Sequence, residues 1–408
     1  MSRDQRGIEF AEELRKFAVF GSETAETVLE LDSDTTIPVM TNEFWTSKQR
    51  AAHSLHEVSY RACFKPQLPG FFIERLTEKD DRVFDPFMGR GTTLIEAALH
   101  GRRVGGCDIN PLSLNLIRPR LNPPSLNDIR TRLKTLPLES GGTIDESLLV
   151  FYHPDTLHEI HALRRHFISA GSELDAVDAW IRMVATNRLT GHSSGFFSVY
   201  TLPPNQAVSV ASQERINRKR NQRADYRDVR SLILRKSKAL LKDCRQEDCD
   251  ALIKASDSAI LINRSSDDMQ GIEDESVSLV VTSPPFLDIV NYTTDNWLRC
   301  WFNGINANDV PIWQLRNLND WEAAMERTFL ELKRILKPGG WIAFEVGEVR
   351  KGGVKLEENV AKVASQTGLR PVLIMINRQE FTKTSACWGV SNLEKGTNSN
   401  RIVLLQKR

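Results

Sequence analysis

The stretch VFDPFMGRGTT, residues 83–93, decides the fold of this chain. Apolar residues lead into an acid, a glycine-rich turn follows, and residues 94–100 continue as an apolar helical run. A strand that passes through a glycine turn into a helix leaves free N–H groups facing the space above the strand end. The stretch therefore predicts the first strand, turn and helix of a parallel α/β sheet, with a ligand bound at the turn.

A second strand is predicted at residues 103–108, where the sequence RVGGCD ends in another acid. Asp108 lies 23 residues after Asp85, about the offset at which an acid of the second strand binds ribose hydroxyls in nucleotide-binding sheets. Leu94 occupies the position of the third glycine in the dinucleotide fingerprint, which disfavours a pyrophosphate ligand. The two acids and the glycine turn therefore predict a nucleoside ligand without phosphates.

The sequence VVTSPPF, residues 280–286, runs from an apolar strand into two prolines. Prolines cannot donate to a strand ladder, so the strand must end there in a stiff, extended loop. The carbonyls of Ser283 and Pro284 can then accept hydrogen bonds from an amino group, and Phe286 offers a flat face. Such a set suits a flipped nucleobase, although a strand followed by an ordinary proline turn would have the same sequence.

Together, DPFMGRGTT (residues 85–93) and TSPPF (residues 282–286) resemble the S-adenosylmethionine-dependent amino-methyltransferases of DNA. The serine before the two prolines is similar to the cytosine-N4 branch, whereas adenine-N6 members more often have Asp or Asn there. The resemblance implies S-adenosylmethionine as cofactor, DNA as partner and no metal. It assigns catalysis to Ser283, Pro284, Pro285 and Phe286.

The resemblance also implies a cofactor site. The glycine loop and the segment that begins at Phe64 would hold the methionine part, Asp108 would hold the ribose, and Asp267 would bind the adenine amine. The full expected set is Phe64, Lys65, Pro66, Asp85, Phe87, Gly89, Gly91, Thr92, Asp108 and Asp267.

Three other functions share parts of this pattern. An adenine-N6 DNA methyltransferase and an RNA methyltransferase acting on an exocyclic amine would both keep the proline loop. A non-catalytic nucleic-acid-binding protein on the same fold is disfavoured because Asp85, Asp108 and Ser283 are all present. A cognate restriction endonuclease is a candidate partner, and the oligomeric state is left open.

The composition is that of an ordinary soluble protein, with 40% hydrophobic and 26% charged residues. No apolar run approaches the ~18 residues of a membrane span, and the charged N-terminus does not resemble a signal peptide, so a cytoplasmic protein is expected. None of the six cysteines follows a proline, which disfavours the thiolate chemistry of cytosine-C5 methylation. Four histidines between residues 153 and 166 match no zinc spacing and are expected on a helix surface.

The chain is long enough for a catalytic domain with an insertion. We expect a doubly wound, Rossmann-like methyltransferase sheet with strands at Val83, Val104, Ile260, Val280 and Ile342 and a terminal antiparallel hairpin at residues 371–376 and 401–405. The predicted parts are a helical N-terminal arm (1–60), the catalytic domain (61–121 and 256–408) and a helical insertion that recognises DNA (122–255). The loop at residues 382–388 is expected to line the base pocket.

Positive charge is concentrated in residues 215–242, which contain 11 basic and two acidic residues. The segment carries +9 while the whole chain carries +1, so the remainder carries −8. Such asymmetry predicts a polyanionic partner, although charge runs are also typical of solvated helix faces. The expected DNA contacts are Arg215, Arg218, Lys219, Arg220, Arg223 and Arg227.

Overall fold

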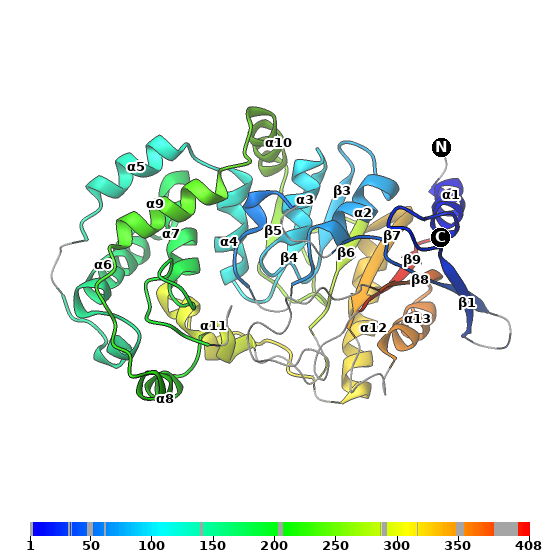
Figure 1. Cartoon of the computed structure of the whole chain (residues 1–408). Helices are drawn as coiled ribbons and strands as arrows, with labels where there is room; N and C mark the ends of the chain where they lie inside the picture. The colour runs from blue at the N-terminus through cyan, green and yellow to red at the C-terminus, as the bar shows by residue number, and fades with distance from the viewer. Residues whose placement is uncertain are drawn as a thin grey trace.

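The structure is a computed structural model, and it is built on one sheet of nine strands (Figure 1). It describes residues 3–31, 33, 35–46, 52–60, 63–138, 142–202, 207–285, 287, 292–315, 317–347, 355–378 and 399–408. The strand order is β1-β2-β8-β9-β7-β6-β3-β4-β5. The strands are β1 (Ala25–Glu30), β2 (Thr36–Asn42), β3 (Arg82–Asp85), β4 (Arg103–Cys107), β5 (Ile260–Ile262), β6 (Val277–Thr282), β7 (Leu336–Val346), β8 (Arg370–Arg378) and β9 (Ser399–Gln406).

The predicted fold class is confirmed by the central strands. β7, β6, β3, β4 and β5 lie side by side and run parallel, and they contain the five strand residues expected from the sequence. β9 lies between β7 and β8 and is antiparallel to both, which is the expected terminal hairpin. Because parallel strands end at one edge of the sheet, the loops that follow β3, β4, β5 and β6 meet there.

Helices cover both faces of the sheet. On one face, α1 contacts β7, α2 contacts β6, α3 contacts β3 and β4, and α10 contacts β4; on the other face, α13 contacts β8 and β9 and packs on α12. Side chains alternate along each strand, so Leu279 and Val281 of β6 enter one core while Val280 enters the other. The helices are α1 (Arg3–Arg15), α2 (Gln67–Leu76), α3 (Thr92–Leu99), α4 (Leu112–Leu121), α10 (Gln246–Asp257), α12 (Leu318–Ile335) and α13 (Leu356–Gln366).

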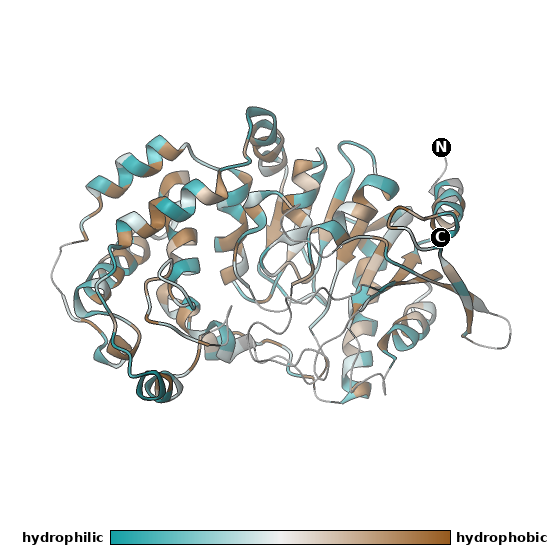
Figure 2. Ribbon diagram, in the orientation of Figure 1, coloured by the Kyte–Doolittle hydropathy of each residue, from teal (hydrophilic) through white to brown (hydrophobic). Residues whose placement is uncertain are grey.

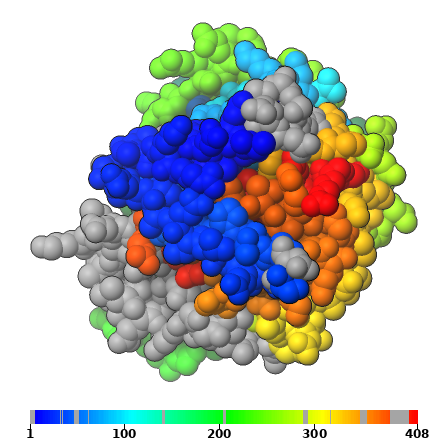
Figure 3. Space-filling model, turned by 90° about the vertical axis from the view of Figure 1, so that its right-hand side faces the viewer, coloured from blue at the N-terminus to red at the C-terminus, as the bar shows by residue number. Residues whose placement is uncertain are grey.

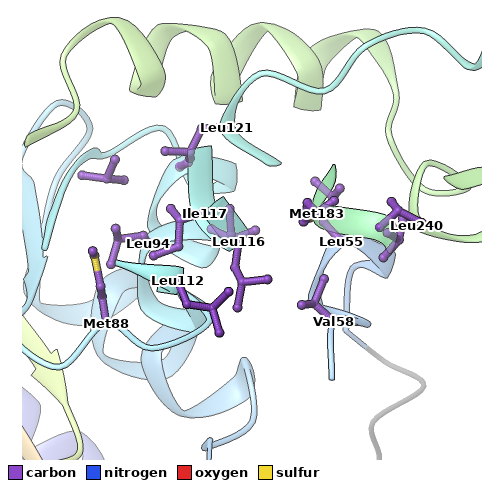
Figure 4. Packing of buried hydrophobic residues seen from close by; sticks show 14 of the residues in the cluster. Leu55, Val58, Met88, Leu94, Leu112, Leu116, Ile117, Leu121, Met183 and Leu240 are labelled. Carbon is purple, nitrogen blue, oxygen red and sulfur yellow. The ribbon is translucent and has the colours of Figure 1, made fainter. Parts of the chain in front are cut away.

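A further group of helices lies beyond β5, at the left of Figure 1. It consists of α5 (Leu126–Thr135), α6 (Pro154–Ala170), α7 (Ala176–Arg188), α8 (Val210–Arg220) and α9 (Val229–Leu240), and α11 (Tyr292–Phe302) packs on α7. One apolar cluster runs from the sheet into these helices, joining Leu116 and Leu55 to Met183 and Leu240 (Figure 4). Apolar residues of these helices gather on their inner faces (Figure 2).

The expectation of a helical N-terminal arm is wrong beyond α1, where the chain continues as the strands β1 and β2. Residues 27–29 lie in β1, and β2 pairs in parallel with β8, more than 300 residues away in sequence. Figure 3 shows the N-terminal residues in blue against the C-terminal strands in orange and red. The pattern around Val28 is too short to distinguish a strand from a helix. The residue pairs with Pro38 of β2 in a local hairpin, and β2 in turn pairs with the distant β8. Within the described residues, no helix is both long and apolar enough to cross a membrane.

Candidate active site

A pocket of about 860 Å³, part of it open to solvent, lies at the carboxyl ends of β3, β4 and β6. Its mixture of aromatic side chains and a few converging polar groups is typical of a small-molecule site. It is lined by Tyr60, Cys63, Phe64, Asp85, Pro86, Phe87, Met88, Gly89, Thr92, Asp108, Ile109, Asn110, Ser265, Ser266, Ser283, Pro285, Pro311, Ile312 and Trp313. The structure therefore brings both predicted acids and the predicted catalytic serine to one cavity.

Asp85 links the glycine turn to β6, the strand that precedes the predicted catalytic loop. Asp85 ends β3, and its Oδ1 accepts hydrogen bonds from the Thr282 hydroxyl (2.6 Å) and the Phe87 N–H (3.0 Å). Burial raises the pKa of Asp85 to about 7, although the bonds from Thr282, Phe87 and Thr93 oppose this shift. A cationic group in the pocket would therefore find a carboxyl group that gains stability by ionising beside it.

The second acid fixes the glycine turn from the neighbouring strand. Asp108 follows β4 and accepts the Gly89 N–H at Oδ2 and the Asn110 N–H at Oδ1, both at 2.8 Å. Burial raises the pKa of Asp108, and these bonds oppose the shift. Gly91 does not line the pocket: it begins α3 with φ of +76°, and a Cβ there would lie 2.4 Å from Ile117 Cγ1. Its role is to shape the turn.

Among its described residues, the pocket lining has acidic side chains but no basic ones. Its described lining includes Asp85 and Asp108 but neither lysine nor arginine. A phosphate would meet two carboxylates and no cation, whereas a positively charged ligand is favoured. This charge pattern agrees with the absence of a third glycine at Leu94.

Aromatic side chains form the walls. The rings of Phe87 and Trp313 lie 6.2 Å apart at 64°, and Tyr60 and Phe64 line the pocket as well. Phe64, Phe87 and Thr92 were expected here, but Tyr60, Asn110 and residues 311–313 were not. Trp313 comes from the loop between α11 and α12, and nothing in that loop's own sequence indicates which distant pocket it joins.

The loop that was predicted to be catalytic follows β6. Ser283 and Pro285 line the pocket, and the Pro285 carbonyl accepts the indole N–H of Trp321 at 3.3 Å. Pro284 is described but is not among the lining residues. Phe286 and residues 382–388 lie outside the described residues.

Besides Gly91, three expected cofactor residues are not part of the pocket lining. Asp267 is held by the Ser265 hydroxyl and by Arg327 Nε at 2.9 Å, so Ser265 and Ser266 reach the pocket instead. Pro66 precedes α2 as its N-cap, and burial followed by repulsion from Arg90 lowers the pKa of the neighbouring Lys65. Among the described residues, neither Lys65 nor Pro66 is in the lining.

Five of the six expected DNA-binding residues are exposed, and they lie in or just after α8. They are Arg215, Arg218, Lys219, Arg220 and Arg223. Arg220 also lies 3.8 Å above the ring of Tyr200. Arg227 differs, because its guanidinium donates to the carbonyls of Ser193, Phe196 and Ser198. That side chain fastens a loop and is only partly exposed.

The histidines at residues 153–166 were expected on a helix surface, but His161 is buried. His161 lies 5.1 Å from the ring of Trp301 and accepts the Asp145 N–H. Among the described residues, no three His, Cys, Asp or Glu side chains come together in a way that could hold a metal.

Residues 26–118 match a family model, N6_N4_Mtase, described as DNA methylase. Two curated relatives are the Type II methyltransferase M.MvaI of Kocuria varians, 42% identical over 71 residues, and M.MjaII of Methanocaldococcus jannaschii, 34% identical over 76 residues. These matches cover 17% and 19% of this chain and only 15% and 14% of the relatives' lengths.

Solved structures match this chain at lower sequence identity. An S-adenosylmethionine-dependent methyltransferase from Methanosarcina mazei is 12% identical and covers 82% of this chain and 96% of its own, with a TM-score of 0.31. A Thermus thermophilus protein described as a DNA modification methylase, solved with S-adenosyl-L-methionine, is 23% identical over 34% of this chain and 50% of its own, with a TM-score of 0.22. The matches to residues 26–118 and to the two curated relatives confirm the resemblance to the DNA amino-methyltransferases that the sequence motifs predicted, with the N4 and N6 branches pooled in one family model.

Proposed function

We propose that this protein is an S-adenosylmethionine-dependent DNA methyltransferase that acts on the exocyclic N4 amine of a flipped cytosine. One observation carries the proposal: Ser283, at the end of β6, lines the same acidic, aromatic pocket as Asp85 and Asp108. A methyl acceptor bound by Ser283 and a nucleoside bound by the two acids would therefore be neighbours.

The pocket residues fit the nucleoside and the cationic groups of the proposed cofactor, which has two positive groups, one carboxylate and no phosphate. Asp108 would bind the ribose hydroxyls, and the aromatic pair Phe87 and Trp313 would enclose the adenine. Asp85 would face the methionine ammonium. Ser265 and Ser266, which line the pocket, replace Asp267 as partners for the adenine amine. Bound there, S-adenosylmethionine would supply an electrophilic methyl group.

The catalytic loop would prepare the amine. The lone pair of a cytosine amine is delocalised into the ring, so the nitrogen is a poor nucleophile. Hydrogen bonds from its N–H groups to Ser283 and the Pro284 carbonyl would favour a pyramidal nitrogen aimed at the methyl group. We expect Phe286 to stack on the base with ~1–3 kcal/mol, comparable with the few kcal/mol that flipping costs.

The DNA would be held by the helices beyond β5. α8 and α11 lie along the same lower edge in Figure 1, and α11 follows the catalytic loop in sequence. The exposed cations of α8 are therefore suited to bind phosphates of a duplex whose target base enters the pocket.

The test identifies the product. The protein is incubated with DNA and labelled S-adenosylmethionine, the DNA is hydrolysed to nucleosides, and the methylated nucleoside is identified by mass and retention. We expect N4-methylcytosine, and Ser283→Ala should abolish it while cofactor binding by calorimetry stays unchanged. N6-methyladenine would show that Ser283 accepts an adenine amine, 5-methylcytosine would overturn the mechanism, and a methylated RNA with unmethylated DNA would overturn the partner.

A further inference from the structure

A buried carboxyl group lies next to the proposed catalytic serine. Glu345 is in β7, and the register places Thr282 of β6 opposite Phe344, so Ser283 and Glu345 are the next residues along these two strands. Their side chains lie close enough for the Ser283 hydroxyl to stabilise the ionised Glu345 carboxylate. Nothing in the sequence indicates this pair, because WIAFEV (residues 341–346) is typical of an ordinary buried strand.

The environment of Glu345 is unusual for a charged residue. The residue is only 6% exposed, and its second partner is the Asn400 amide, whose Nδ2 donates to Oε1 at 3.0 Å. Burial raises the pKa of Glu345, the bonds from Ser283 and Asn400 oppose the shift, and no charged group of the described chain adds to it. By contrast, the buried Glu357 of α13 pairs with Arg401.

We propose that Glu345 is a positioning residue that orients the Ser283 hydroxyl toward the methyl-accepting amine and receives the proton that this amine loses. The inference rests on the proposed function. An ionised carboxylate only accepts hydrogen bonds, so the Ser283 O–H must donate to it. The lone pairs of Ser283 Oγ are then left for an N–H group in the pocket.

The same pair gives the proton a route. The amine nitrogen bonds to the methyl carbon while that carbon's bond to the donor sulfur breaks and leaves its electron pair on sulfur. The nitrogen is then positively charged and releases one proton to Ser283 Oγ, whose own proton passes to Glu345. A carboxyl group whose pKa burial has raised is a better proton acceptor than an exposed one. It would later lose the proton to solvent.

The first experiment needs neither cofactor nor DNA. The pKa of Glu345 is measured by carbon-13 NMR of protein labelled at the glutamate carboxyl carbons, with Glu345→Gln identifying the signal. Ser283→Ala should raise this pKa further, because it removes a bond that stabilises the ionised form. An identical pKa in the parent and in Ser283→Ala would overturn the proposal.

The second experiment measures single-turnover methyl transfer at saturating cofactor and DNA. Glu345→Gln keeps the shape but cannot take a proton, so we expect a rate loss of about 10²–10⁴-fold with unchanged cofactor affinity. Glu345→Asp should restore part of the rate, and the acidic limb of the parent's pH profile should disappear in Glu345→Gln. Glu357→Gln, which removes a buried carboxylate away from Ser283, is the matched control and should keep the parent's rate.

The outcomes separate the two proposals. A Glu345→Gln rate within threefold of an active parent overturns the role of Glu345 and leaves the proposed function standing. A parent protein that methylates no nucleic acid overturns the proposed function and the proton route with it, whereas the NMR titration still decides whether the serine and the carboxyl group are coupled.

Discussion

Asp85 illustrates how burial can prepare a single residue for a ligand. Its side chain sits beneath the glycine turn and is 2% exposed, and burial raises its pKa to about 7. Without a ligand, the folded protein therefore keeps a proton on Asp85 at pH values where the unfolded chain, with a carboxyl of ordinary pKa, has lost it. The proposed cofactor's ammonium group would replace that proton.

We therefore expect the free energy of unfolding of the cofactor-free protein to fall as the pH rises from about 4 to 7. The folded state binds the extra proton in this window, so the expected slope is about −1.4 kcal/mol per pH unit from this group, levelling off above pH 7. Urea unfolding of the parent and of Asp85→Asn, which keeps the shape, measures the difference. Equal slopes for the two proteins would contradict the assignment.

For single residues, the sequence was informative where a local backbone geometry requires a particular residue type. Asp85, Asp108, Gly89 and Ser283 were predicted because each follows a strand whose end is visible in the sequence. The positions of Asp267 and Arg227, by contrast, are decided by partners that are distant in sequence. Arg327 binds Asp267 and three loop carbonyls bind Arg227, and these contacts are not visible in the segments that contain the two residues.

One short element completes the pocket wall. Tyr60 lies in the segment that follows η2 (Ser54–His56) and lines the pocket. Three contacts hold η2 and this segment in place. Arg90 Nη1 donates to the Val58 carbonyl at 2.8 Å, Arg120 Nη1 donates to the Leu55 carbonyl at 3.2 Å, and His56 Nε2 lies 2.8 Å from Glu96 Oε2 on α3. These contacts join the wall to the helix that begins at the glycine turn.

Glu96→Gln should loosen this wall. Burial opposes ionisation of Glu96, but its bonds to His100 and His56 lower its pKa to about 2. The stabilisation is therefore present above the ordinary carboxyl pKa of 4.5 and is lost as the pH falls toward 2. At neutral pH we expect a loss of about 1.5–3 kcal/mol in unfolding free energy and weaker cofactor binding by calorimetry.

Glu74→Gln is the matched control for this prediction. Glu74 lies 3.7 Å from His100, but its side chain is 55% exposed, so its removal should change stability by less than about 0.5 kcal/mol. Equal effects of the two substitutions would show that the buried His56 contact does not hold the wall.

The N-terminal strands are the element that the sequence misjudged. β2 is an interior strand between β1 and β8, and its Met40 is fully buried, whereas Val28 of β1 is 64% exposed. Met40→Asp should therefore destabilise the protein by more than about 3 kcal/mol, because it buries an unpaired charge, while Val28→Asp should stay within about 0.5 kcal/mol. Thermal unfolding of both variants tests this, and similar melting temperatures would argue against the pairing of β2 with β8.

At the scale of the whole molecule, one apolar cluster connects the sheet to the outer helices while the charge is divided between them. Buried residues of β6, α4, α7 and α9 belong to the same cluster, so the outer helices are fixed relative to the pocket. The segment 215–242 carries +9 and the rest of the chain −8. The sequence predicted this division of charge, but the structure was needed to separate cations that fasten loops, such as Arg227, from those exposed on α8.

This division predicts where DNA binds. Replacing Arg218, Lys219, Arg220 and Arg223 by alanine should weaken DNA binding and reduce the slope of log affinity against log salt by roughly 0.9 for each phosphate that is no longer neutralised. Cofactor affinity should not change, because none of the four lines the pocket.

A control variant with Lys16, Lys79, Lys254 and Lys362 replaced removes the same charge from other exposed positions. If both variants bind DNA equally weakly, only the net charge matters; if the α8 variant binds like the parent at every salt concentration, its cations are a solvated helix face and DNA is held elsewhere. Weaker binding by the α8 variant alone would instead support binding of the duplex by the outer helices, which share one apolar cluster with the sheet that carries the pocket.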